Sequence, residues 1–295
     1  MNPTPRIASA LAAIAAVAIV VRFAFAEREP PTRCPRGLDP EGARCCGAGQ
    51  DLVGERCTGP LIACGPGQFR IDAGIASACV LEEEKIELPG GVLPPGAADW
   101  QRAPSSEPIE VAPFAIDRGE VTVWRYAECV AKKACKELPG TPEPGLPVTG
   151  LPPEEAERFC RFAKGRLPTA AEWRFAASGS EGRRFPWGFT GLVCRRAAFG
   201  LEQGPCSHSG TGPDLVGARP DGATPEGVLD LSGNVAEWTR DPDGRYRARG
   251  GSYRSRVAAE LVTAAVESPD PRATHVGFRC VYPIAKGTAP PAPTK

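Results

Sequence analysis

Apolar residues in the middle of the chain recur at helical spacing in three short stretches. Thr122 stands where a hydroxyl side chain caps a helix that reaches about Ala131. The apolar residues of 152–164 fall on one face, which predicts a second helix. Thr169 and Glu172 form a capping box and predict the start of a third.

Strand patterns are shorter than the helical ones. Pro113–Asp117 alternates like a strand, and from Phe185 onward the sequence breaks into short runs separated by turn residues. The chain carries 34 glycines and 33 prolines, which favour loops and turns over long helices. The pattern therefore predicts helices early in the main domain followed by irregular β structure.

The N-terminal residues 1–26 have the pattern of an export signal. A short basic start precedes the apolar run Ile7–Val21, and Ala24-Phe25-Ala26 fits a cleavage site between small residues. The apolar run is shorter than the roughly 20 residues that cross a bilayer. We expect a cleaved signal peptide and an exported protein, either periplasmic, cell-surface or secreted; the alternative is an uncleaved signal anchor formed by residues 7–21.

The chain contains 12 cysteines, an even number that behind an export signal favours disulfides over free thiols. Six of them lie in a Gly-rich segment, 34–79, and six cysteines allow 15 connectivities. A weak internal repeat favours local pairs: Cys34–Cys45, Cys46–Cys57 and Cys64–Cys79. A zinc site is the weaker alternative, because the segment has no histidine and its cysteine spacings are wide.

Composition divides the rest of the chain. The Pro- and Gly-rich stretch 80–107 predicts an extended linker, and the Pro- and Ala-rich stretch 284–295 predicts a flexible tail. Between them, 108–283 is long enough for one domain with its own core. The 35 basic and 35 acidic residues leave no net charge, which argues against a nucleic-acid or anionic-membrane partner.

Several blocks in 109–282 resemble the formylglycine-generating enzyme, or sulfatase-modifying factor, family. The motifs that carry the resemblance are Leu167–Trp173, Phe185–Gly188, Gly233–Thr239, Arg249–Tyr253 and Gly277–Cys280. The resemblance implies a C-type-lectin-like α+β fold for this domain. It also implies a long-range disulfide between Cys160 and Cys280.

Catalytic members of that family hold copper with two cysteines that follow the Gly-Gly-Ser-Tyr block. Counting from Ser252 places Ser255 and Glu260 at those two positions. Copper(I) is a soft ion that selects thiolates, so a hydroxyl and a carboxylate suit it poorly. We expect no copper and no catalytic residue here, with Ser252, Ser255 and Glu260 as degenerate positions.

The remaining cysteines do not supply a substitute thiolate pair. Cys129 with Cys135 and Cys194 with Cys206 are each close enough in sequence to form short disulfide loops. With the Cys160–Cys280 bridge that the resemblance implies, every cysteine of the main domain has an expected partner.

The resemblance further implies a structural calcium site at Asn234 and Glu237, with the Val235 carbonyl as another candidate ligand. Oxygen donors of this kind suit Ca²⁺. The alternative is a buried, hydrogen-bonded turn that needs no ion. A second family calcium site is doubtful, because Ala198 stands where the family has an asparagine.

Other chemistries have less support. His208 and His275 are isolated, and a Ser252–His275 hydrolase lacks a Gly-x-Ser-x-Gly elbow. The tryptophans are expected in the core rather than on a sugar-binding platform. We predict a non-catalytic binding or scaffold module of the cell envelope with a protein or glycan partner; the alternative is a formylglycine-generating or related envelope-maturation oxidoreductase.

Overall fold

The computed structural model describes residues 38–41, 44–47, 51–53, 56–58, 64, 67–73, 76–95, 107–140, 142–207 and 212–284. All of them belong to one structural unit, Arg33–Lys295. The expected signal segment 1–26, the tail 285–295 and His208 lie outside the described residues. Within the described residues, no helix is long and apolar enough to cross a membrane.

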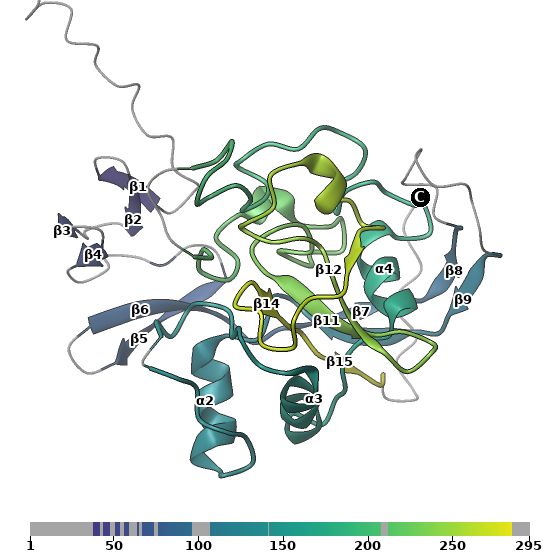
Figure 1. The fold of residues 1–295 in the computed structure, drawn as a ribbon, viewed down its shortest axis with the longest axis horizontal. Coiled ribbons are helices and arrows are strands. Elements are labelled where there is room, and N and C mark those ends of the chain that lie inside the picture. The colour runs from purple at the N-terminus through teal and green to yellow at the C-terminus, as the bar shows by residue number, and fades with distance from the viewer. Residues whose placement is uncertain are drawn as a thin grey trace, which may run out of the picture. The chain divides into compact units, whose positions relative to one another are not determined.

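Figure 1 shows the helices of the domain, and two of them begin at the capping residues that the sequence predicts. Helix α2 (Val123–Ala131) follows Thr122, whose side chain accepts a hydrogen bond from the Arg125 backbone N–H at 3.2 Å. Helix α4 (Ala170–Ser178) carries the complete capping box at Thr169. Helix α3 (Pro153–Phe162) lacks a side-chain cap and starts instead with proline, whose fixed φ suits a first helical turn.

Two sheets organise the domain. In the first, β10 (Phe114–Asp117) pairs antiparallel with β7 (Lys85–Leu88) and β15 (Val281–Tyr282). In the second, β11 (Ala236–Arg240) pairs antiparallel with β12 (Tyr246–Arg249) and parallel with β14 (Val276–Gly277). Strand β13 (Val266–Glu267) extends that sheet beyond β12. After α4, the described residues outside these strands form turns and two 3₁₀ segments, Pro220–Gly222 and Ala258–Glu260, as expected for the predicted α+β fold.

The remaining strands form two-stranded hairpins. They are β1 (Leu38–Glu41) with β2 (Arg44–Gly47), β3 (Asp51–Val53) with β4 (Arg56–Thr58), β5 (Gln68–Ala73) with β6 (Ala76–Leu81), and β8 (Gly91–Leu93) with β9 (Ile109–Val111). Short paired strands suit the cysteine-rich segment, which has few large apolar residues to bury.

The expected linker 80–107 requires correction over residues 80–95. These residues form the end of β6 and all of β7 and β8. Leu88 and Leu93 are at most 2 % exposed. Helix α4 packs against β8 and β9. The glycines and prolines of this stretch mark tight turns between strands rather than solvated chain, and the folded domain begins well before residue 108.

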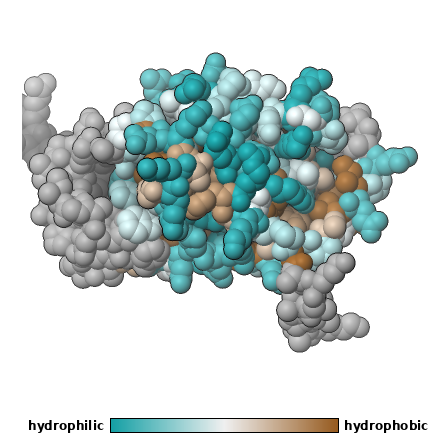
Figure 2. Space-filling model, turned by 90° about the horizontal axis from the view of Figure 1, so that it is seen from below, coloured by the Kyte–Doolittle hydropathy of each residue, from teal (hydrophilic) through white to brown (hydrophobic). Residues whose placement is uncertain are grey.

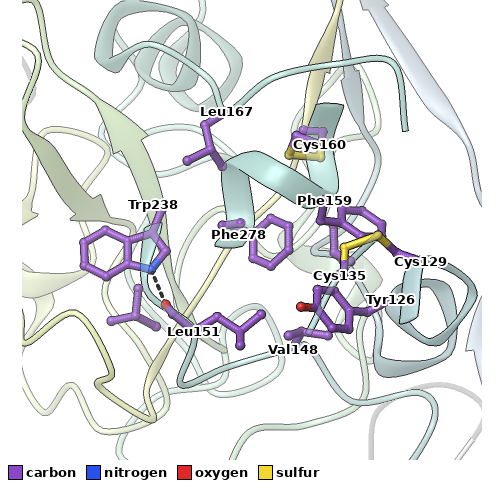
Figure 3. Close-up of a cluster of buried hydrophobic side chains, with 14 of the residues drawn as sticks. Tyr126, Cys129, Cys135, Val148, Leu151, Phe159, Cys160, Leu167, Trp238 and Phe278 are labelled. Carbon is purple, nitrogen blue, oxygen red and sulfur yellow. Dashed lines mark hydrogen bonds between the residues drawn. A yellow bond between two sulfur atoms is a disulfide. The ribbon is translucent and has the colours of Figure 1, made fainter. Parts of the chain in front are cut away.

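The largest apolar cluster joins α2 and α3 to the second sheet (Figure 3). Tyr126 and Phe159 stack with ring centroids 5.5 Å apart, and Phe278 meets Phe159 edge-on. Trp238 is buried and its indole N–H donates to the Leu151 carbonyl at 3.1 Å. Trp173 is also buried. Trp124 is 44 % exposed, so the prediction that the tryptophans lie in the core is wrong for Trp124.

Four of the six expected disulfides are present. They are Cys64–Cys79, Cys129–Cys135, Cys160–Cys280 and Cys194–Cys206. The described residues contain no free cysteine. The pairs Cys34–Cys45 and Cys46–Cys57 lie outside the described side chains and stay predictions.

On the face that Figure 2 shows, the coloured surface is mostly hydrophilic, with patches of hydrophobic residues among hydrophilic ones. Disulfides of this number are typical of proteins exported to an oxidising compartment.

Removing the Cys160–Cys280 bridge should cost far more stability than removing Cys129–Cys135. The bridges span 120 and 6 residues. The chain-entropy argument then gives about 5 kcal/mol for the long loop and about 2 kcal/mol for the short one. Urea unfolding of the two double-alanine variants measures both values. Equal losses would show that closure of the long loop is not what stabilises the fold.

Candidate functional site

Two consecutive glycines turn the chain at the end of β12. Gly250 and Gly251 have φ values of +92° and +65°, which side chains rarely adopt. A Cβ atom on Gly251 would lie 2.5 Å from the Glu260 carbonyl oxygen and 3.0 Å from Ser255 Oγ. The loop of residues 250–261 therefore folds back on itself, and it brings positions 255 and 260 to the same glycine.

Both of these positions make hydrogen bonds to the backbone of the 250–261 loop. Ser255 Oγ accepts from the Ser252 N–H at 3.0 Å, and the Glu260 carboxylate accepts from the Arg256 N–H at 2.9 Å. Buried Ser252 Oγ accepts in turn from the Arg254 N–H at 3.2 Å. At both of these positions, then, the side chain bonds the backbone of its own loop.

Arg254 and Arg256 flank Ser255 and reach neighbouring loops. Arg254 donates to Thr274 Oγ1 at 3.1 Å and lies over the Tyr253 ring. Arg256 donates to Gln203 Oε1 at 2.9 Å. His275 does not bond Ser252; its Nε2 lies 3.4 Å from Glu267. The structure gives no support to a Ser252–His275 hydrolase.

Beneath the loop lies an ion pair between Glu237 on β11 and Arg279, which precedes β15. Arg279 is 0 % exposed, and its Nε and Nη2 donate to the two oxygens of Glu237 at 2.7 and 2.6 Å. The Trp173 indole N–H donates to the same carboxylate at 2.8 Å. Arg279 also donates to the backbone carbonyls of residues 117, 118 and 229. We call Glu237, Arg279 and Trp173 the buried frame.

A second polar group adjoins this frame. Asn234, in the left-handed region at φ +56°, donates to Glu120 Oε1 at 3.0 Å and accepts from the Asp214 N–H at 2.9 Å. Asp230 accepts from the Gly217 N–H at 2.6 Å. Burial raises the pKa of Glu120 well above its usual value, and the nearby charge of Asp230 raises it further. Burial likewise raises the pKa of Asp230.

The donor set at Asn234 and Glu237 does not fit a calcium ion in this arrangement. Both Glu237 oxygens already bind Arg279, and the Asn234 oxygen is taken by a backbone N–H. No group of three or more His, Cys, Asp or Glu among the described residues is placed to hold a metal. Calcium stays a prediction of the sequence.

Comparison with known proteins identifies the family of this chain. Residues 73–284 match the family described as "Sulfatase-modifying factor enzyme 1-like domain". The chain belongs to the sulfatase-modifying factor family. The match begins at residue 73, in keeping with the strands found before residue 108.

The relatives of this chain include proteins named as formylglycine-generating enzymes and others named as inactive forms of that enzyme. The formylglycine-generating enzyme of Streptomyces coelicolor is 33% identical over 175 residues, 48% of this chain and 54% of that protein. The "Inactive C-alpha-formylglycine-generating enzyme 2" of Bos taurus is 33% identical over 153 residues, 46% of this chain and 50% of that protein. The chain thus spans about half the length of the curated relatives it matches.

Solved structures show the same fold. CarF superposes with a TM-score of 0.54 at 22% identity, covering 70% of this chain and all of CarF. PvdO from Pseudomonas aeruginosa gives a TM-score of 0.52 at 19% identity, covering 74% of this chain and 99% of PvdO. At these identities the likeness concerns the fold alone.

Sequence reasoning did not assign three residues of the polar core. Arg279 lies in the motif Gly277–Cys280, but no chemical role was predicted for it. An arginine between two core residues nevertheless indicates a buried partner. Glu120 and Asp230 carried no local signal, because the residues they meet lie far away in the sequence.

The raised pKa of Glu120 predicts stability that falls as pH rises. A carboxyl group with a higher pKa in the folded state binds more protons when folded, so the free energy of unfolding decreases above its unfolded pKa of about 4.3. Glu120→Gln keeps an acceptor for Asn234 and should flatten this decline. A pKa change of one unit corresponds to about 1.4 kcal/mol.

Urea unfolding at pH 5, 6.5 and 8 in chelator-treated buffer measures the effect. Exposed Glu110 on β9 offers a matched control, since Glu110→Gln removes a carboxylate outside the buried cluster. Parallel pH profiles for the original protein and Glu120→Gln would contradict the predicted protonation.

Proposed function

We propose that this protein is an exported, non-catalytic binding or scaffold module of the cell envelope that uses the sulfatase-modifying factor fold. The observation that carries the proposal is the hydrogen bonding of Ser255 and Glu260. Each occupies a position where catalytic relatives are expected to place a copper-binding cysteine, and each already bonds a backbone N–H of its own loop.

The chemistry of the donors supports this reading. A neutral hydroxyl and a hard carboxylate do not offer Cu(I) the thiolates that it selects. The eight cysteines of the described disulfides cannot substitute, because all of them are bonded. An inactive relative at 33% identity shows that the family includes members without the catalytic activity.

The partner, on this proposal, is a protein or a glycan met outside the cytoplasm. The disulfides support export, and the balanced charge gives no reason to expect nucleic acid. The competing function is a formylglycine-generating or related maturation oxidoreductase, favoured by identities of about 30% to several active enzymes.

A copper and turnover assay separates these two functions. Purified protein given Cu(I), oxygen and a Cys-x-Pro-x-Arg peptide should bind no stoichiometric copper and form no aldehyde. Mass spectrometry of the peptide and metal analysis of the protein report both results. Aldehyde formation by the unmodified protein would overturn the proposal.

The double variant Ser255→Cys with Glu260→Cys tests whether the loop geometry has survived. Because Gly251 brings both positions together, we expect the variant to gain tight Cu(I) binding. The matched control, Ser255→Ala with Glu260→Gln, removes the same side chains without adding thiols and should bind none. Equal copper content in the two variants would show that positions 255 and 260 no longer converge.

A further inference from the structure

A stack of aromatic and arginine side chains lies beside the 250–261 loop. The rings of Phe185 and Trp187 are parallel within 4°, with centroids 5.0 Å apart. The Arg184 guanidinium lies 5.6 Å from the Phe185 centroid, and that of Arg196 lies 5.8 Å from the Trp187 ring. The stack is bonded to the segment that follows the loop: the Thr263 N–H donates to the Arg184 carbonyl at 3.0 Å, and its hydroxyl donates to the Arg183 carbonyl at 2.7 Å.

The guanidiniums on this side are held largely by neutral groups. Arg196 donates to Thr190 Oγ1 at 2.6 Å, and Arg256 donates to Gln203. Within the described residues, neither of them nor Arg184 makes an ion pair. Arg254 has only Glu202, at 3.7 Å.

The local charge is therefore positive. Residues 184–207 and 250–261 together carry five arginines and two carboxylates, Glu202 and Glu260, and one of the arginines, Arg195, pairs with Asp221. The Glu260 carboxylate accepts from the Arg256 backbone N–H rather than from a guanidinium. Arginines fixed by neutral partners keep their charge available for a carboxylate, which a guanidinium can bind through two hydrogen bonds.

Apolar side chains are exposed in the same loops. Phe189 is 66 % exposed, Val193 is 42 % exposed and Val257 is 54 % exposed. Aromatic residues and arginine are enriched where proteins bind other proteins. A surface that combines exposed apolar groups with uncompensated arginines is complementary to a partner that is both acidic and apolar.

A glycan partner fits this surface less well. Sugar recognition by stacking needs a free aromatic face, and Trp187 is already stacked by Phe185 and Arg196. The Trp187 indole N–H is also used, since it donates to the Thr190 carbonyl at 3.2 Å.

We propose that the arginine surface, defined by Arg184, Arg196, Arg254 and Arg256 with Phe189 and Val257, binds an acidic segment of a partner protein that also carries apolar residues. This inference rests on the proposed non-catalytic function and names its ligand class. Carboxylates of the segment pair with the guanidiniums, and its apolar side chains cover Phe189 and Val257. Arginine side chains in such positions often dominate the binding energy.

Selection from phage-displayed random 12-residue peptides tests the proposal on the full mature protein. We expect enriched peptides to be rich in Asp and Glu together with Leu, Ile or Phe. A synthetic consensus peptide should bind at least 10-fold more weakly to Arg196→Gln with Arg256→Gln, and more weakly at high salt, because salt screens exposed charges. Fluorescence anisotropy measures both changes.

The matched control is Arg240→Gln with Arg245→Gln. It removes the same charge from the exposed β11–β12 hairpin and should leave peptide binding within 2-fold. Thermal melts confirm that both double variants are folded.

Selections without acidic enrichment, no enrichment at all, or binding unaffected by the first variant would overturn the inference. So would tight retention of an anionic oligosaccharide with no peptide binding, which would indicate a glycan partner. These failures leave the proposed function standing, because only copper binding and aldehyde formation by the unmodified protein overturn that.

Discussion

The buried ion pair between Glu237 and Arg279 is the interaction on which the rest of the domain depends. A charge pair removed from water destabilises a fold unless its remaining hydrogen-bond groups are satisfied. A guanidinium has five N–H donors, and the partners of Arg279 use them all: the two Glu237 oxygens and the carbonyls of residues 117, 118 and 229. Arg279 thereby joins β11, the end of β10 and the turn that precedes Asp230.

The same carboxylate fixes the position of α4 relative to the second sheet. The Trp173 indole N–H donates to Glu237, and a Cβ on Gly250 would lie 3.1 Å from the Trp173 ring. The start of the 250–261 loop therefore rests on the buried frame. Because Cys280 follows Arg279 directly, the disulfide to Cys160 ties α3 to the same point.

This arrangement separates two tasks. The buried frame sets where the loop lies, while the loop's own side chains determine what it can bind. Ser255 and Glu260 belong to the second of these. A shared fold can carry different chemistry in its loops, so family membership alone does not establish activity.

Local chemistry made part of this structure predictable. The caps at Thr122 and Thr169 are signals carried within a few residues, so the starts of α2 and α4 followed directly. The Cys160–Cys280 bridge required the family resemblance, because nothing in the spacing of those two residues indicates it. Counting along the motifs singled out Ser255 and Glu260, and the structure brings both positions close to Gly251; the loss of copper ligands there stays a prediction.

The features that sequence reasoning missed are those that depend on distant parts of the chain. Strands β7 and β8 lie in a Pro- and Gly-rich stretch whose composition suggests a linker, and only packing against β10 and α4 makes them strands. The contact between Glu120 and Asn234 joins residues 114 apart. The sequence does not show that Arg279 binds both Glu237 oxygens, because this contact also joins residues that are far apart in the chain.

Amide hydrogen exchange of the 250–261 loop tests the central claim most directly, because the claim is that this loop is held by its own side chains without a metal. In chelator-treated protein, the N–H groups of Ser252 and Arg256 should be protected, since Ser255 and Glu260 accept from them. Ser255→Ala should remove the protection of the Ser252 N–H, and Glu260→Gln should reduce the protection of the Arg256 N–H. Rapid exchange of both groups that becomes slow only when copper or calcium is added would contradict the account.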